Sequence, residues 1–264
     1  MKTMNKINKK SAFWAGTAVL ITGVFLTTAG NTLARGTDIL HFNDVTVFTN
    51  NGVEPNADGL VMASQYKQGH ADNQKLTVAV TSLSPNNTYE LMAVVDTDSN
   101  LVDVASFTTD AKGRALLDYR SLGNGHGGGR GRFSLPLSLN PVSLVREVDV
   151  VDSNLQAVLT ADLTMPDRLQ YLVKRDLSTN SIRAELRIEA NMRATHFDLM
   201  ASGLAPTNSY LLAFNGDVIE TNTASARGRL NIHAASGTPS YVLDLRSVEL
   251  WDSSSNMVLQ TTLP

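Results

Sequence analysis

The chain contains no cysteine among its 264 residues, which excludes a fold held by disulfide bonds and an anchor built on a lipid-modified cysteine. Tryptophan is scarce too, with Trp14 and Trp251 as the two examples. Carbohydrate-binding sandwiches generally present several aromatic side chains as a stacking platform, and this chain has few to offer. With 42% hydrophobic and 18% charged residues, the chain can bury a sizeable core, which excludes an intrinsically disordered protein.

Acidic residues are missing from the start of the chain, where Asp38 is the first. Lys2, Lys6, Lys9 and Lys10 lie within the first ten residues, and the whole chain has a net charge of −3. Removal of these lysines leaves a more acidic chain, which is a poor electrostatic partner for nucleic acid or anionic lipid. We therefore expect no nucleic-acid partner.

The N-terminal segment is typical of an export signal. Residues 12–30 carry no charge, follow the basic residues and precede Thr32-Leu33-Ala34, which fits a small-residue cleavage site. We expect residues 1–34 to be a signal peptide, or else an uncleaved signal anchor, because residues 12–30 are just long enough to span a bilayer. Either way, everything after Arg35 is exported to the periplasm, the exterior or the cell surface. A membrane contact is expected only through residues 12–30, if the segment is retained.

The rest of the chain carries an internal duplication. Three segments recur in the same order: VTSLSPNNTYELMAV as MASGLAPTNSYLLAF, FTTDAKGRALL as TNTASARGRLNI, and VDVVDSNLQAVLTADL as VELWDSSSNMVLQTTL. The separation between matching segments shrinks along the chain, so the first copy has longer loops. We place copy 1 at residues 38–164 and copy 2 at residues 167–264, divided at Met165-Pro166-Asp167, where the proline is a natural break.

Both copies have the pattern of short β-strands. In KLTVAVTSL, Leu76, Val78 and Val80 alternate with smaller or polar residues, as in a half-buried strand. Turn-forming segments recur between such strands: Asp110-Ala111-Lys112-Gly113, Ser225-Ala226-Arg227-Gly228, Asp152-Ser153-Asn154 and Asn215-Gly216. We expect an all-β protein with two tandem β-sandwich-like repeats after an N-terminal signal helix, each repeat enclosing its own core.

Two short motifs resemble a known family. Leu83-x-Pro85-x-x-x-Tyr89 and Leu204-x-Pro206-x-x-x-Tyr210 resemble the corner motif of fibronectin type III and related immunoglobulin-like sandwiches. In that family, a tyrosine early in a late strand bonds to the backbone a few residues upstream and fixes the crossover between the sheets. The resemblance implies tandem immunoglobulin-like repeats of a secreted bacterial protein. It implies a compartment and no activity.

A glycine-rich loop covers residues 123–132. Its segment His126-Gly127-Gly128-Gly129 matches the oxyanion-loop motif of some lipases and esterases, but the G-x-S-x-G partner motif is missing from the sequence. Arg130 and Arg132 are too few for a nucleic-acid-binding segment. We interpret the loop as a flexible insertion, which copy 2 does without.

A second candidate site begins at Asp96. Asp96, Asp98 and Asn100 match the start of a calcium-binding loop, in which oxygen ligands alternate along the chain. Leu101 stands where that loop needs glycine, and Phe107 where it needs a bidentate glutamate. The sequence favours a plain hairpin turn and leaves calcium binding open.

The histidines form no metal-binding pattern. They are His41, His70, His126, His196 and His233, and no two have the spacing of a zinc site. His196 and Asp198 would share one face of a strand, which we interpret as an exposed strand face. We assign no catalytic, cofactor-binding or metal-binding residue, and we expect no cofactor.

These observations predict a non-catalytic exported structural or interaction module that presents loops on a duplicated β scaffold. Its partner would be an extracellular or envelope protein or a glycan, met by the loops at residues 96–101 and 122–133. One alternative is a secreted or periplasmic hydrolase with clustered His and Asp side chains in a cleft at the junction of the repeats. Another is a carbohydrate-binding module, which would need exposed coplanar tyrosines.

Overall fold

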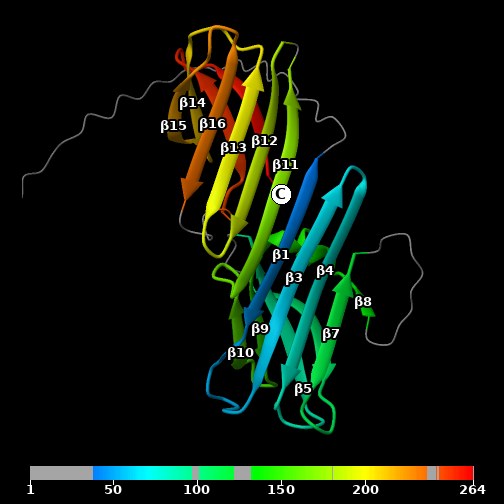
Figure 1. Cartoon of the computed structure of the whole chain (residues 1–264). Helices are drawn as coiled ribbons and strands as arrows, with labels where there is room; N and C mark the ends of the chain where they lie inside the picture. The colour runs from blue at the N-terminus through cyan, green and yellow to red at the C-terminus, as the bar shows by residue number, and fades with distance from the viewer. Residues whose placement is uncertain are drawn as a thin grey trace, which may run out of the picture. The chain divides into compact units, whose positions relative to one another are not determined.

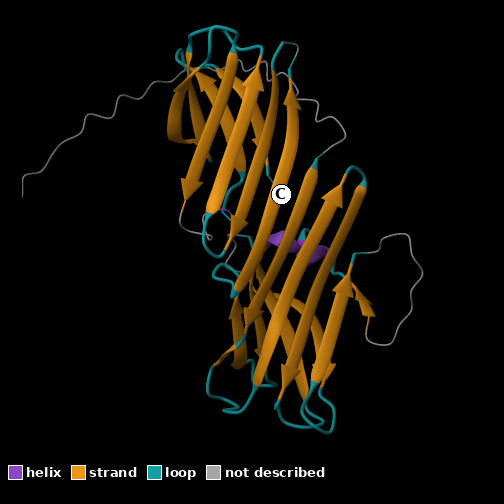
Figure 2. Ribbon diagram, viewed as in Figure 1, coloured by secondary structure: helices purple, strands orange, loops and turns teal. Residues whose placement is uncertain are grey.

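The computed structural model describes residues 38–96, 101–121, 132–179, 181–236, 242 and 244–263. This part of the chain is all-β, as the sequence predicts, and it contains no helix of seven or more residues (Figure 2). The expected signal segment, residues 1–34, lies outside the described residues, and so does the glycine-rich loop apart from Arg132.

Copy 1 contributes ten strands and two 3-10 turns. The strands are β1 (Ile39–Val47), β2 (Thr49–Asn50), β3 (Asp58–Gln68), β4 (Ala71–Thr81), β5 (Thr88–Val95), β6 (Leu101–Thr108), β7 (Ala115–Arg120), β8 (Arg132–Ser134), β9 (Val145–Val151) and β10 (Ala157–Asp162). The turns, η1 (Leu137–Leu139) and η2 (Val142–Leu144), lie between β8 and β9.

Copy 2 contributes eight strands in the same order. They are β11 (Arg168–Ser178), β12 (Arg183–Asn191), β13 (Thr195–Ser202), β14 (Ser209–Phe214), β15 (Asp217–Thr223), β16 (Arg229–Ser236), β17 (Ser247–Asp252) and β18 (Met257–Thr262). Copy 2 has no described counterpart of the short strands β2 and β8.

The strands form three sheets (Figure 1). A nine-stranded sheet has the order β16-β13-β12-β11-β1-β3-β4-β7-β8, so its halves come from different copies. A five-stranded sheet, β2-β10-β9-β5-β6, belongs to copy 1, and a four-stranded sheet, β15-β14-β17-β18, belongs to copy 2. We call the nine-stranded sheet the shared sheet.

The two copies share one topology, down to their irregularities. The β5–β6 register shifts between Leu91 and Met92, and the β14–β15 register shifts at the matching residues Leu212 and Ala213. The β9–β10 and β17–β18 pairs also shift at matching places, beside Val150 and Leu250. A bulge re-aims side chains and bends a strand, so matching bulges give the two smaller sheets the same shape. The division at residues 165–167 itself stays a prediction.

The copies meet at an antiparallel ladder between β1 and β11, which we call the seam. Phe42 lies opposite Tyr171, its own counterpart in copy 2 by strand register, as in a two-fold arrangement. The expectation of a separate core in each repeat is wrong, because one hydrophobic cluster includes buried residues of both copies. The physical reason is that β1 and β11 would each leave an open sheet edge, and pairing them removes both edges.

The tyrosines of the two motifs make the contact that the resemblance implies. The Tyr89 hydroxyl accepts a hydrogen bond from the backbone N–H of Ser84 at 3.1 Å. The Tyr210 hydroxyl accepts the matching bond from Ala205 at 3.0 Å. Both rings are buried, so each hydroxyl satisfies a backbone donor in the segment that leaves the shared sheet.

Two glycines close the turns opposite these corners. Gly113 and Gly228 have positive φ values of 70° and 67°, and their carbonyls accept hydrogen bonds from Leu83 and Leu204, each at 3.1 Å. A Cβ on Gly228 would lie 2.2 Å from the Leu204 carbonyl oxygen. Glycine is therefore required at this turn for its backbone angle and for the close approach.

We expect Gly228→Ala to lower the free energy of unfolding by about 3 kcal/mol, through a positive φ and a backbone clash together. Gly216→Ala is the matched control, because Gly216 has a φ of 87° but a Cβ there would meet nothing within 4 Å; it should cost only about 1 kcal/mol. Urea unfolding of both variants measures the difference. Equal losses would show that the close approach to Leu204 does not matter.

Candidate functional site

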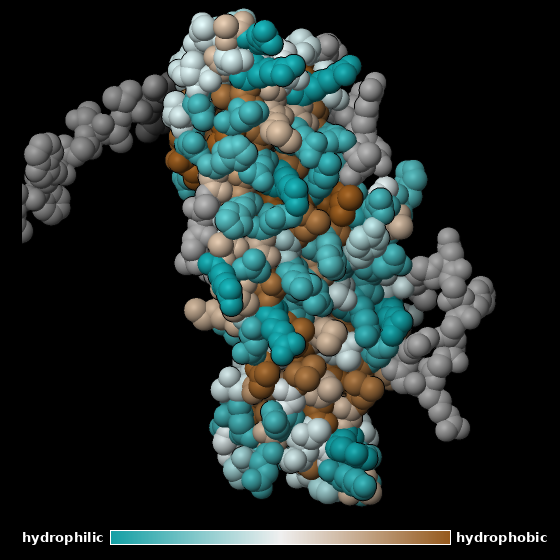
Figure 3. All heavy atoms as spheres, viewed as in Figure 1, coloured by the Kyte–Doolittle hydropathy of each residue, from teal (hydrophilic) through white to brown (hydrophobic). Residues whose placement is uncertain are grey.

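The shared sheet has a core face and a solvent face. On β12, Leu186 and Ile188 point into the core, while Glu185, Arg187 and Glu189 alternate with them. The same alternation continues on the neighbouring strands. We call the solvent side the outer face. Figure 3 views the molecule from this side, with β16, β13, β12, β11, β1, β3, β4 and β7 in front (Figure 1).

The copy 2 half of the outer face is strongly charged. Lys174 Nζ lies 2.9 Å from Glu185 Oε1, and His233 Nδ1 lies 2.5 Å from Asp198 Oδ1. Arg187 is also paired with Glu189. Exposed pairs of this kind add little stability, but they make this half of the face hydrophilic.

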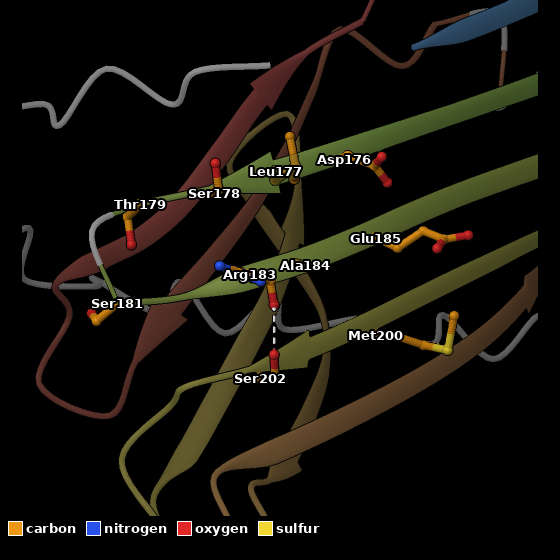
Figure 4. A pocket seen from close by; sticks show the side chains of 10 residues that line it. All are labelled: Asp176, Leu177, Ser178, Thr179, Ser181, Arg183, Ala184, Glu185, Met200 and Ser202. Carbon is orange, nitrogen blue, oxygen red and sulfur yellow. Dashed lines mark hydrogen bonds between the residues drawn. The ribbon is translucent and has the colours of Figure 1, made fainter. Parts of the chain in front are cut away.

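A hollow of about 640 Å³ opens at the end of β11, β12 and β13 (Figure 4). Asp176, Glu185 and Met200 are direct cross-strand neighbours along its floor. The Ser202 hydroxyl donates a hydrogen bond to the Arg183 carbonyl oxygen at 3.4 Å. The residues that line this hollow include carboxylates and hydroxyls but no histidine, so it offers polar contacts rather than a nucleophile with an adjacent base.

A second hollow lies on the copy 1 half and contains Tyr66. The Tyr66 ring meets His41 edge-on, with centroids 6.3 Å apart, and the hollow is also lined by Asn73, Lys75 and Arg120. The other described tyrosines, at positions 89, 119, 171 and 210, are buried. The coplanar tyrosines that a carbohydrate platform needs are therefore not found among the described residues; Tyr241 lies outside them.

The His196-Phe197-Asp198 segment lies on the outer face, as we interpret it from the sequence. His196 and Asp198 are on the same side of β13, but Asp198 bonds His233 of β16 instead of His196. The His233 side chain is 70% exposed. This pair is on an open strand surface and not in a cleft.

Charged side chains also gather beside the seam. Arg146 of copy 1 pairs with Asp244 of copy 2 at 3.5 Å, while Arg246, the counterpart of Arg146, pairs with Asp96 of copy 1 at 2.5 Å. Burial lowers the pKa of Arg146, and the neighbouring Arg246 charge lowers it further. The two pairs cross in opposite directions, so these charges tie the copies together. The hydrolase alternative expects histidines here, and these pairs contain none.

Asp96 is thus held between the copies. Its carboxylate accepts a hydrogen bond from Arg246, and its backbone N–H donates to the Leu144 carbonyl oxygen at 2.7 Å. Asp98 and Asn100 lie outside the described residues. Calcium binding by these three residues stays open.

Two further findings concern the described part of the chain. No three His, Asp or Glu side chains there are grouped so that they could hold a metal ion. Within the same residues, no helix is long and apolar enough to cross a membrane.

Comparison with protein-family models, with curated proteins and with solved structures finds no match for this chain. The likeness to fibronectin type III domains therefore depends on the corner motif and its hydrogen bond. Any functional site has to follow from the geometry of the chain itself.

Sequence reasoning missed Asp44, a carboxyl group buried in the seam. Asp44 is 1% exposed; Oδ1 accepts a hydrogen bond from the Thr46 hydroxyl at 2.9 Å, and Oδ2 is buried without a hydrogen-bond partner in the described structure. Burial raises the pKa of Asp44, the Thr46 hydrogen bond lowers it, and the charges of Asp167 and Asp162 raise it, so that the pKa is about 7. The strand pattern could have revealed it, because Asp44 has the same phase as the apolar residues of β1.

The raised pKa makes the seam sensitive to pH. The folded chain keeps a proton on Asp44 that the unfolded chain releases near pH 3.8, so stability is lost as the pH rises from about 4 to about 7. The loss is on the order of 4 kcal/mol. We expect Asp44→Asn to remove this part of the pH dependence in unfolding measured at a series of pH values.

Asp44→Val should remove the same part of the pH dependence, because it also lacks the carboxyl group. The fold accepts valine at the matching position of copy 2, which by strand register is Val173. Asp217→Asn, on an exposed hairpin strand, is the control and should keep the full slope. If Asp44→Asn leaves the slope unchanged, Asp44 is not the group that titrates.

Proposed function

We propose that this chain is a non-catalytic exported module that binds a partner of the cell envelope or exterior through the outer face of its shared sheet. The observation that carries this proposal is the continuous strand ladder from β16 to β8. One side of that ladder packs on the core, and the other side is open to solvent across both copies.

The seam makes this face suited to binding. Because Ile39 to Val45 of β1 are paired with Arg168 to Lys174 of β11, the outer face of copy 1 continues into that of copy 2 without a flexible link. The crossed pairs Arg146–Asp244 and Arg246–Asp96 hold the same junction from the core side. A rigid surface loses little conformational entropy when it binds a partner.

The proposal places the contact on strands, whereas the sequence favoured loops. Residues 97–100 and 122–131 of those loops lie outside the described residues, so a role for them stays a prediction.

We also propose that each copy is an immunoglobulin-like sandwich. The bonds of Tyr89 and Tyr210 to backbone N–H groups support this assignment.

A glycan is the second candidate partner, and the hollow around Tyr66 favours it. An exposed aromatic ring beside amide, ammonium and guanidinium donors is suited to a sugar ring and its hydroxyls. A single exposed ring is a smaller platform than known glycan-binding surfaces offer, so a protein partner remains the first choice.

We expect residues 35–264 used as bait on envelope and exterior material to capture one defined partner. Charge reversal at the copy 2 hollow, with Asp176→Lys and Glu185→Lys together, should abolish capture of a protein. Tyr66→Ala should abolish capture of a glycan. Val218→Thr is the control, because Val218 is 56% exposed on β15, outside the shared sheet.

Two outcomes would contradict the proposal. One is capture that no outer-face substitution changes. The other is turnover of generic ester, peptide or glycoside substrates that a single His or Asp substitution abolishes, which would support the hydrolase alternative.

A further inference from the structure

Four apolar side chains form a line across the copy 1 half of the outer face. Val47, Leu60, Ala79 and Leu116 lie directly opposite one another on β1, β3, β4 and β7. Leu116 is 63% exposed, Val47 52% and Leu60 36%. We call this line the apolar stripe; brown side chains gather over the lower strands of this half in Figure 3.

Copy 2 shows that the fold does not need these residues. By strand register, the stripe corresponds to Asp176, Glu185, Met200 and Asn231, which also lie opposite one another. The same strands in the same order thus accept carboxylates and an amide at these positions. Folding therefore does not require the exposed leucines and valine of copy 1.

The stripe continues into further apolar surface. Val45 and Met62 form the next cross-strand pair on the same face, and both are half-buried. The charged groups nearby have partners: Asp118 lies 2.8 Å from Arg120 Nη2 and 3.5 Å from Lys75 Nζ, and the Asp167 carboxylate accepts a hydrogen bond from the Val47 backbone N–H at 2.6 Å. The four residues of the stripe carry no charge, and depletion of charge is typical of the core of a protein interface.

We propose that the apolar stripe binds the stripe of a second copy of this chain and forms a two-fold dimer. Two sheets pack face to face at about 10 Å, and a flat apolar line is best matched by an identical one. The charged copy 2 half of the face offers no such match. Because each chain has a single stripe in its described part, a two-fold contact closes at two chains and does not extend into a fibre.

The area around the stripe allows a contact that is smaller than a standard interface. The four strands are six to eleven residues long, and at about 4.8 Å between strands and about 3.3 Å per residue their whole outer face presents roughly 600 Å². A standard interface buries about 800 Å² of each partner, so a dimer of modest affinity is expected. This inference goes beyond the proposed function, because self-association needs no outside partner and leaves the copy 2 hollow uncovered.

The test is the mass of the chain in solution. Sedimentation equilibrium of residues 31–264, which form one compact unit, should give a monomer–dimer equilibrium. Leu60→Glu and Leu116→Asn introduce the residues that copy 2 carries at the matching positions. Each should weaken the dimer by about thirtyfold or more and leave the unfolding transition in place.

Val218→Glu is the matched control, because it adds a charge at a similarly exposed valine outside the shared sheet, and it should dimerise normally. Since the chain has no cysteine, Ala79→Cys supplies a single thiol in the stripe and should form a disulfide-linked dimer on oxidation. Val218→Cys should not.

A wild-type chain that stays monomeric at every concentration would overturn the proposal, as would stripe variants that dimerise like the wild type. A monomer that instead co-sediments with phosphatidylglycerol vesicles would assign the stripe to a lipid surface and would equally overturn it. If the stripe variants lose the dimer but still capture the partner, the dimer is supported and the proposed binding function does not depend on it.

Discussion

The architecture depends on the antiparallel ladder between β1 and β11. Each of these strands would be an open edge in an isolated copy, with unpaired N–H and C=O groups along its length. Pairing them satisfies both rows of backbone groups and joins the two halves into one sheet. The core follows from this junction, because the side chains of β1 and β11 that point inward, such as Phe42 and Tyr171, pack into one continuous cluster.

Buried and partly buried charged side chains lie near the seam. Arg146 and Arg246 occupy matching positions, and each finds its carboxylate in the other copy. Breaking such a partly buried pair leaves a charge without compensation, so the pairs favour one alignment of the copies. Asp44 is the exception, since burial raises its pKa and its second oxygen lacks a partner among the described residues.

The duplication serves as an internal control for function. The corners at Tyr89 and Tyr210, the tight turns at Gly113 and Gly228, and the bulges of the smaller sheets recur in both copies. These shared features are what the fold requires. Differences on the outer face, such as Leu60 against Glu185, are not needed for folding, and this contrast supports our proposal that the apolar half and the charged half make different contacts.

The sequence by itself determined the all-β class, the recurrence of equivalent segments and the position of both corner tyrosines. These features depend on local alternation and on turn residues such as Asn215-Gly216, which act over a few neighbouring positions. Only the tertiary structure decided that the copies share one sheet, because edge pairing joins segments far apart in sequence. The same holds for the stripe: Val47 and Leu116 are ordinary exposed residues until four strands bring them into one line, since a cross-strand row has no signature along the chain.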